Sequence, residues 1–124
     1  MFKSILLVGI GGFFGSILRY LISYYLGVKT LSAIPYGTLT VNVLGSFFLG
    51  VIIGFTWQDS TTTGTRLFLA TGFCGGFTTF STFSYEFFLM LQDGHIHAGM
   101  LYMFFSVVSG LLAVWCGYLL MIRF

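Results

Sequence analysis

The residues best suited to bind an ion gather in one stretch of the chain, residues 72–84. This stretch reads GFCGGFTTFSTFS and combines glycines and phenylalanines with five hydroxyl side chains. Where helix follows the glycines, Phe80 and Phe83 share one helix face, and Ser81 and Ser84 share another. An aromatic stripe is typical of a packed core, but ring edges and hydroxyls also present positive hydrogens to an anion.

The same stretch predicts a break in a membrane helix. Gly72, Gly75 and Gly76 each weaken a helix by roughly 1 kcal/mol relative to alanine. Main chain freed from a helix at membrane depth must be buried in protein or line a watery cavity, because unpaired peptide groups are costly in hydrocarbon. We therefore expect the break to lie at an interface or along a pathway, with Ser81 and Thr82 as candidate pore hydroxyls.

Polar side chains at helical spacing occur in two further apolar segments. Thr38 and Asn42 are four residues apart and should share a helix face. Asn42 would either make a hydrogen bond between helices or line a pore and donate its amide hydrogens to an anion. Near the end of the chain, Tyr102, Ser106 and Ser109 follow at spacings of four and three and predict a second polar stripe.

Few charged residues lie inside the apolar segments. Arg19 would either extend its side chain to the membrane interface or face a water-filled vestibule and attract anions. Glu86 would be either a proton-relay carboxylate or a group near the interface. His95 and His97 lie in a polar loop without further ligands nearby, which favours a solvated loop over a metal site.

The composition is that of an integral membrane protein. Of 124 residues, 57% are hydrophobic and 6% are charged, with a mean hydropathy of +1.00, whereas soluble domains are about 25% charged. The net charge of +2 is too small for a nucleic-acid-binding surface. We expect an all-α protein with a single membrane domain, residues 1–124, whose third helix is broken near its middle. The expected spans cover about 5–26, 37–55, 67–91 and 100–121.

Small residues in these spans predict close helix contacts. Gly11 and Gly15 form a G-x-x-x-G pair in the first span, and the glycines of residues 50–54 repeat this spacing in the second. Cys74 and Cys116 lack the paired spacing of a metal or redox motif, so we expect both to be small buried hydrophobic residues.

The flanking cations bear on membrane orientation. With four spans both termini lie on one side, and the cations divide between the two sides as Lys3, Arg66 and Arg123 against Lys29 and Arg19. So small a bias permits insertion in either orientation. Four helices alone enclose no pore, and oppositely inserted copies can pair about an axis in the membrane plane. We therefore expect an antiparallel, dual-topology homodimer.

These features bear on three functional classes. Polar stripes without a strongly placed charge suit a channel, because neutral donors bind an ion yet release it, and the donors present favour an anion. A proton-coupled exporter of small molecules normally needs a carboxylate in mid-membrane, for which Glu86 is the sole candidate. A non-transporting assembly subunit would leave the glycine-rich break without a purpose.

The chain resembles the Fluc (CrcB) family of bacterial fluoride channels along all four spans. The resemblance is carried by three motifs, Gly12-Phe13-Phe14-Gly15 leading to Arg19, Gly37-Thr38-Leu39-Thr40-Val41-Asn42, and residues 72–84 with Glu86. It implies a fluoride-selective channel, not an enzyme, that exports fluoride passively from the cytoplasm. It also implies two pores per antiparallel dimer and a multi-pass location in the bacterial inner membrane.

The resemblance further implies roles for individual residues. Main-chain carbonyls of Gly75 and Thr78 from both copies would hold one structural sodium ion on the twofold axis. The residues that match the family's pore positions are Asn42, Phe80, Phe83, Tyr102 and Ser106. Where the family often has a second serine in the last span, this chain has Gly110, with Ser109 one position away.

Overall fold

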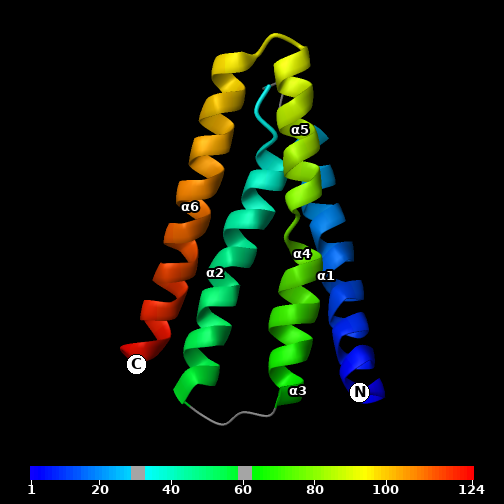
Figure 1. The fold of residues 1–124 in the computed structure, drawn as a ribbon, viewed down its shortest axis with the longest axis vertical. Helices are drawn as coiled ribbons and strands as arrows, with labels where there is room; N and C mark the ends of the chain where they lie inside the picture. Colours follow the sequence, from blue (N-terminus) through cyan, green and yellow to red (C-terminus); the bar gives the residue numbers. More distant parts are fainter. Residues whose placement is uncertain (29–32, 59–62) are drawn as a thin grey trace.

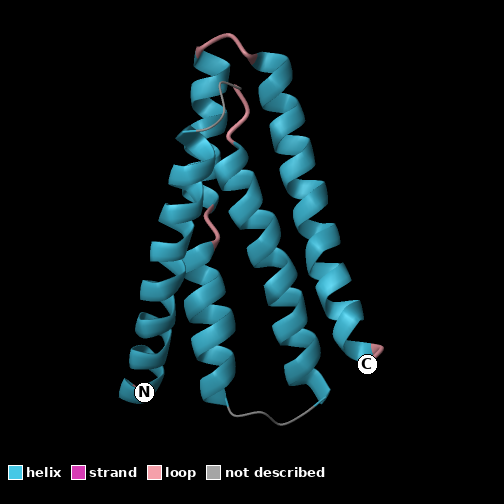
Figure 2. Ribbon diagram, turned by 180° about the vertical axis from the view of Figure 1, so that it is seen from behind, coloured by secondary structure: helices cyan, strands magenta, loops and turns pink. Residues whose placement is uncertain are grey.

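The computed structural model describes residues 1–28, 33–58 and 63–124, which are almost entirely helical (Figures 1 and 2). Lys29, one of the cations weighed for orientation, lies outside the described residues. In chain order the elements are α1 (Phe2–Val28), α2 (Tyr36–Gln58), α3 (Thr63–Arg66), the π-helix η1 (Leu67–Cys74), α4 (Gly75–Phe77), α5 (Phe80–Gln92) and α6 (Ile96–Ile122). Both termini and α3 lie at one end of the molecule, and the α5–α6 turn lies at the other (Figure 1).

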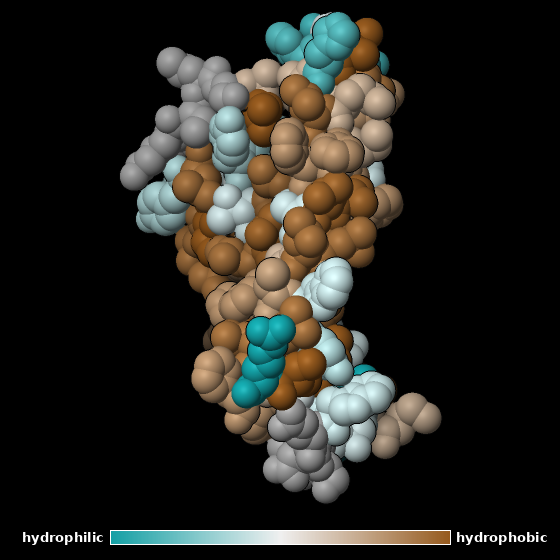
Figure 3. Space-filling view, turned by 90° about the vertical axis from the view of Figure 1, so that its left-hand side faces the viewer, coloured by the Kyte–Doolittle hydropathy of each residue, from teal (hydrophilic) through white to brown (hydrophobic). Residues whose placement is uncertain are grey.

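Three of the described helices are long and apolar enough to cross a membrane, namely Phe2–Gly27, Tyr36–Trp57 and Ile96–Ile122. The third expected span falls on the shorter elements from α3 to α5, which continue one another along the molecule (Figure 1). On the side of the molecule that Figure 3 presents, hydrophobic residues dominate the middle and the most hydrophilic residues lie towards the ends. Such a distribution suits a lipid environment.

Glycines set the contact between α1 and the first half of the third segment. A Cβ atom at Gly11 or Gly15 would overlap main-chain oxygen atoms of η1, and one at Gly76 would lie 2.5 Å from the Gly12 carbonyl oxygen. A side chain at any of these positions would therefore push the two backbones apart. This confirms the close helix contact predicted from the G-x-x-x-G pair.

A second glycine contact joins α2 to α6. A Cβ at Gly50 would overlap the Val114 carbonyl oxygen, and one at Gly117 would overlap the Phe47 carbonyl oxygen. Gly54 is likewise close to α6, so the packing predicted for the second glycine pair is confirmed. Because Gly117 faces α2, the preceding residue points away from it. Cys116 is consequently exposed, and the prediction that it is buried was wrong, whereas Cys74 is buried as expected.

The turn between α5 and α6 is closed by glycine. Gly94 has a φ of 80°, which is readily accessible to glycine. Its N–H donates to the Leu91 carbonyl at 3.2 Å, and the His95 N–H donates to the Met90 carbonyl at 2.9 Å. These two bonds form a Schellman motif that ends α5 and turns the chain directly into α6.

Candidate ion-binding site

Two extended residues separate α4 from α5. Thr78 has φ −88° and ψ 157°, and Thr79 has φ −149° and ψ 120°. At the end of α4, the Thr78 N–H and hydroxyl both donate to the Cys74 carbonyl, at 2.9 and 2.8 Å. At the start of α5, the Thr79 hydroxyl oxygen accepts the Thr82 N–H at 3.2 Å and so acts as the N-cap.

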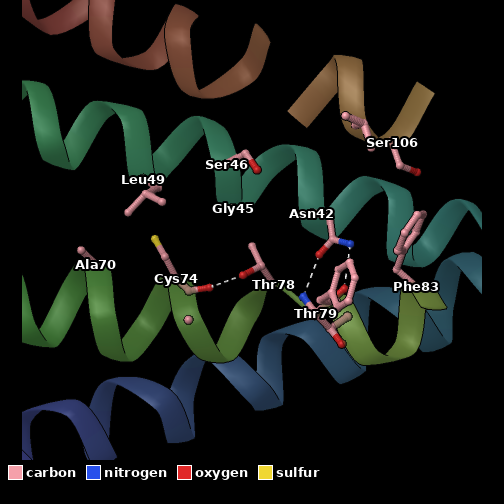
Figure 4. Close-up of a pocket in the computed structure, with 13 residues that line it drawn as sticks. Asn42, Gly45, Ser46, Leu49, Ala70, Cys74, Thr78, Thr79, Phe83 and Ser106 are labelled. Carbon is pink, nitrogen blue, oxygen red and sulfur yellow. Dashed lines mark hydrogen bonds between the residues drawn. The ribbon is translucent and has the colours of Figure 1, made fainter. Parts of the chain in front are cut away.

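Asn42 of α2 holds the second of these residues in place (Figure 4). Its Oδ1 accepts the Thr79 N–H at 2.7 Å, and its Nδ2 donates to the Thr79 carbonyl at 3.0 Å. One side-chain amide thus satisfies both polar main-chain groups of a residue that is only 8% exposed. The interhelical hydrogen bond considered for Asn42 is confirmed, while donation to an anion stays a prediction.

In this arrangement two carbonyl groups lack the N–H donors that they would have in a continuous helix. In a continuous α-helix the Thr79 N–H would bond to the Gly75 carbonyl, and the Thr82 N–H would bond to the Thr78 carbonyl. Here the Thr79 N–H donates to Asn42 Oδ1 instead, and the Thr82 N–H donates to the Thr79 hydroxyl oxygen. The main-chain oxygens of Gly75 and Thr78 are thereby left available for a hard cation, which prefers oxygen ligands.

A cavity of about 360 Å³ opens beside the extended residues (Figure 4). Apolar atoms make up most of its wall, with a few amide and hydroxyl groups among them. Its lining consists of Asn42, Gly45, Ser46 and Leu49 from α2, Ala70, Cys74, Gly75, Thr78, Thr79, Phe80 and Phe83 from the third segment, and Ser106 and Val107 from α6. The mixture of apolar surface and isolated donors is typical of a small-ligand site.

Four of the residues predicted to line a pore meet in this cavity, namely Asn42, Phe80, Phe83 and Ser106. The Ser106 Oγ atom is buried and has no hydrogen-bond partner within the described parts of the chain. A buried hydroxyl left unpaired costs about 1–3 kcal/mol. Ser106 is therefore a donor without a protein acceptor, as an anion-binding group would be.

The other predicted pore hydroxyls lie elsewhere. The Thr82 hydroxyl oxygen accepts a hydrogen bond from the Thr79 hydroxyl at 3.0 Å, and the Ser81 hydroxyl lies 3.4 Å from the same Thr79 oxygen. Both therefore belong to the cap of α5. Tyr102 is only 2% exposed, and its hydroxyl is directed to α5. None of these three residues lines the cavity.

The aromatic stripe on α5 is only partly exposed. Phe80 is 80% exposed, although it borders the cavity. Its ring centroid lies 6.0 Å from that of Phe83, which in turn lies 5.2 Å from that of Tyr102. The stripe thus begins at an open surface and ends in the buried contact between α5 and α6.

Glu86 connects three helices. Its Oε1 accepts the Thr38 hydroxyl of α2 at 2.7 Å, and its Oε2 accepts the Tyr102 hydroxyl of α6 at 2.9 Å. Thr38 pairs with Glu86 while Asn42, one turn later, pairs with Thr79, so the predicted shared face of Thr38 and Asn42 is confirmed. Thr38 and Glu86 also border a separate cavity of about 210 Å³.

Arg19 lies in α1 and is half-buried. Its Nε atom is buried and has no hydrogen-bond partner among the described residues. The neighbouring Tyr20 is exposed and stacks on Tyr24 with a centroid distance of 6.1 Å. An interfacial position and a vestibule role both remain open for Arg19.

Gly45 and Ser46 are among the residues of the cavity wall that sequence reasoning missed. Gly45 leaves room for the third segment, because a Cβ there would overlap the Thr78 methyl group. Ser46 lies about one turn beyond Asn42 on α2, and that spacing is the signal that could have identified it. Ser109, in contrast, donates its hydroxyl to the Phe105 carbonyl of its own helix.

This chain is similar in sequence to known proteins over most of its length. Residues 6–118 match the model of the family described as CrcB-like protein, Camphor Resistance (CrcB). A relative from Azobacteroides pseudotrichonymphae is 44% identical, with 97% of each chain covered, and one from Methanocaldococcus jannaschii is 45% identical, with 94% of this chain and 93% of the relative covered. A third, from Leptospira interrogans, is 49% identical over 88% of this chain and 87% of its own. All three bear the name fluoride-specific ion channel FluC.

Proposed function

Because this chain belongs to the CrcB-like family, whose relatives bear the names of ion channels and not of enzymes, we propose that it is a fluoride-selective channel. It would export fluoride passively from the cytoplasm and so confer fluoride resistance. The observation that carries the proposal is the cavity in which Asn42 and the unpaired Ser106 hydroxyl lie beside the phenylalanines of α5. The long apolar helices and the family together identify a multi-pass membrane protein, and the inner membrane is its proposed location.

The chemistry of this cavity suits a small anion. Hydroxyl and amide hydrogens are neutral donors, which bind an anion without holding it as a fixed cation would. The edges of the Phe80 and Phe83 rings carry partial positive charge. Fluoride enters a cell as its neutral acid, dissociates at the higher internal pH, and as an anion leaves down its gradient with the help of a negative-inside potential.

The third membrane crossing is proposed to run from α3 to α5, broken at Thr78 and Thr79, so that residues 1–124 form a single membrane domain. Support comes from the placement of the extended pair beside Asn42, which satisfies the Thr79 main chain without water. An interruption paired in this way is compatible with membrane depth, because its polar groups are bonded within the protein.

A structural sodium ion is proposed at the same interruption. The main-chain oxygens of Gly75 and Thr78 would hold it. They are available as ligands because the N–H groups of Thr79 and Thr82 donate to other acceptors. When bound, the ion supplies a positive charge that offsets anions nearby. Gly75 is exposed, and a Cβ there would have no atom within 4 Å, so this residue lies at the surface of the single chain.

An antiparallel, dual-topology homodimer with two pores would complete the site. The cavity is open, and Phe80 is largely exposed beside it. A second copy placed over this surface would bury the ring and close the cavity. Its own Gly75 and Thr78 oxygens would double the number of ligands around an axis in the membrane plane.

A proton-coupled exporter is the alternative function, and Glu86 is the residue that favours it. A carboxylate within a membrane helix is a common proton-exchange group. Here, however, each of its oxygens accepts a hydroxyl from a neighbouring helix, which suits a fixed structural link. The channel is therefore the better-supported function.

Ion efflux from vesicles distinguishes the two functions. The purified protein, reconstituted in liposomes loaded with potassium fluoride or potassium chloride, is diluted into ion-free buffer with valinomycin. We expect a fluoride electrode to record rapid efflux, while chloride efflux stays at the level of empty liposomes. Efflux that requires a pH gradient would support the exporter, and equal rates for both anions would contradict fluoride selectivity.

A further inference from the structure

Several serine hydroxyls in the described helices are already bonded within the protein. Ser84 and Ser109 donate to the carbonyl one turn earlier in their own helix, those of Phe80 and Phe105. Such internal bonding is common for serine in membrane helices and consumes the hydroxyl donor. Within the described residues, the Ser46 hydroxyl makes no such bond. Its donor remains available to whatever enters the cavity that it lines.

The position of Ser46 extends the polar row of α2. It lies one turn beyond Asn42, on the wall of the same cavity, and Ser106 lies across from them on α6 (Figure 4). One turn beyond Ser106 the residue is Gly110, which has no side chain to offer. A Cβ at Gly110 would lie 3.7 Å from the Ser46 Oγ atom, so the Ser46 hydroxyl occupies the space in front of this glycine.

We propose that Ser46 is a fluoride-binding residue of the conduction path, the next donor after Asn42 and Ser106. The proposal rests on the proposed channel function and adds one ion-binding position to the conduction path. An ion that moves along the row loses hydration at each step and needs a replacement donor at each turn. At the level of Gly110, α6 supplies none, and Ser46 supplies it from α2.

The structure also indicates how the assignment can be tested by moving the hydroxyl. A Cβ at Gly110 would make ordinary contact with Ser46, so a serine is accommodated there without displacing the backbone. In the double variant S46A/G110S, the hydroxyl therefore returns to the same space from the opposite helix. The variant S46A/G110A has the same bulk without the hydroxyl and is the matched control.

Initial rates of fluoride efflux from liposomes measure the effect, at equal amounts of protein that elutes as the wild type does in gel filtration. We expect S46A to lower the rate about tenfold or more, as the loss of one hydrogen bond to a charged ligand implies. S46A/G110S should recover most of the rate, whereas S46A/G110A should not. The variant S109A should equal the wild type, because its hydroxyl is bonded within α6.

An S46A rate equal to that of an active wild type would overturn the assignment of Ser46 alone. A double variant S46A/G110S as slow as S46A/G110A would do the same, because a hydroxyl in that space would then be irrelevant. Absence of fluoride efflux from wild-type liposomes would instead overturn the channel function itself. The wild-type measurement therefore separates the two failures.

Discussion

At the scale of single residues, Asn42 decides the geometry of the site. Its amide pairs both polar main-chain groups of Thr79, which a neighbouring strand or helical turn would otherwise pair. It accepts from the Thr79 N–H and donates to the Thr79 carbonyl. In doing so it removes the N–H that would have closed a helical turn on Gly75. One side chain thus stabilises the extended main chain and leaves a carbonyl oxygen available.

Replacing Asn42 by alanine should therefore damage stability and conduction together. Both main-chain groups of the buried Thr79 would lose their partners, which should lower the free energy of unfolding by about 1–3 kcal/mol. Thermal unfolding in detergent, followed by fluorescence, measures the change, and fluoride efflux should fall at the same time.

Ser84→Ala is the matched control for Asn42→Ala. It removes a hydroxyl that bonds only to the Phe80 carbonyl of its own helix, so its melting temperature should stay within a degree or so of the wild type. If the Asn42→Ala protein has the same melting temperature as the wild type, the amide does not stabilise the extended residues Thr78 and Thr79.

At the scale of elements, helix contacts follow from sequence better than the internal form of a helix. The glycine spacings of α1 and α2 predicted their close contacts, because small residues at one-turn intervals have few other uses in a membrane. The π-helix η1, in which the Gly75 N–H donates to the Ala70 carbonyl, was not predictable. No residue type specifies such wide turns, which are rare in proteins.

The candidate site was predictable where a residue type is unusual in a membrane and not where it is common. Asn42 and the glycine and hydroxyl cluster of residues 72–84 are conspicuous against an apolar background. Ser46 is not, since serine in a membrane helix usually bonds its own backbone. Its one-turn spacing from Asn42 and the position of Gly110 on the neighbouring helix distinguish it. The third membrane crossing and its sodium ion stay predictions.

Two glycines of α1 offer a test of the contact with the third segment. A Cβ at Gly11 would overlap a main-chain oxygen of η1, whereas one at Gly9 would meet no atom within 4 Å. Gly11→Ala should therefore lower the free energy of unfolding by about 1–3 kcal/mol or prevent assembly. Gly9→Ala should be neutral or slightly stabilising, because alanine is the better helix former.

Thermal stability and yield in detergent compare the two alanine variants. Both variants add one methyl group, at positions two residues apart on the same helix, so their hydrophobicity is matched. Equal stability of the two proteins would contradict the backbone contact between α1 and η1.

At the scale of the whole molecule, one chain leaves its candidate site unfinished. The cavity is open, Phe80 is largely exposed, and Gly75 lies at the surface with no neighbour. These three features lie on or beside the same wall. A second, inverted copy would account for all of them, which is why the dimer is proposed as the functional unit.

Gly75→Val is expected to separate folding from dimerisation. A Cβ at this position would meet no atom within 4 Å, so we expect the fold to be retained, but the valine side chain would stand between two copies paired at this surface. Gel filtration with light scattering should give a monomer, and fluoride efflux should be lost. Gly27→Val, at a glycine that is also open in the single chain, should remain a dimer. A dimeric, fully active Gly75→Val protein would place the interface elsewhere.

The glycine contact between α1 and the first half of the third segment has a mechanical consequence. Where main chain rests on main chain, no flexible layer lies between the two elements to absorb a shift. We therefore expect α1 and the first half of the third segment to move together as one rigid unit. Because α2 and α6 are joined by the same kind of glycine contact, the cavity lies between two rigid pairs of elements, and its width should change only when one pair shifts against the other.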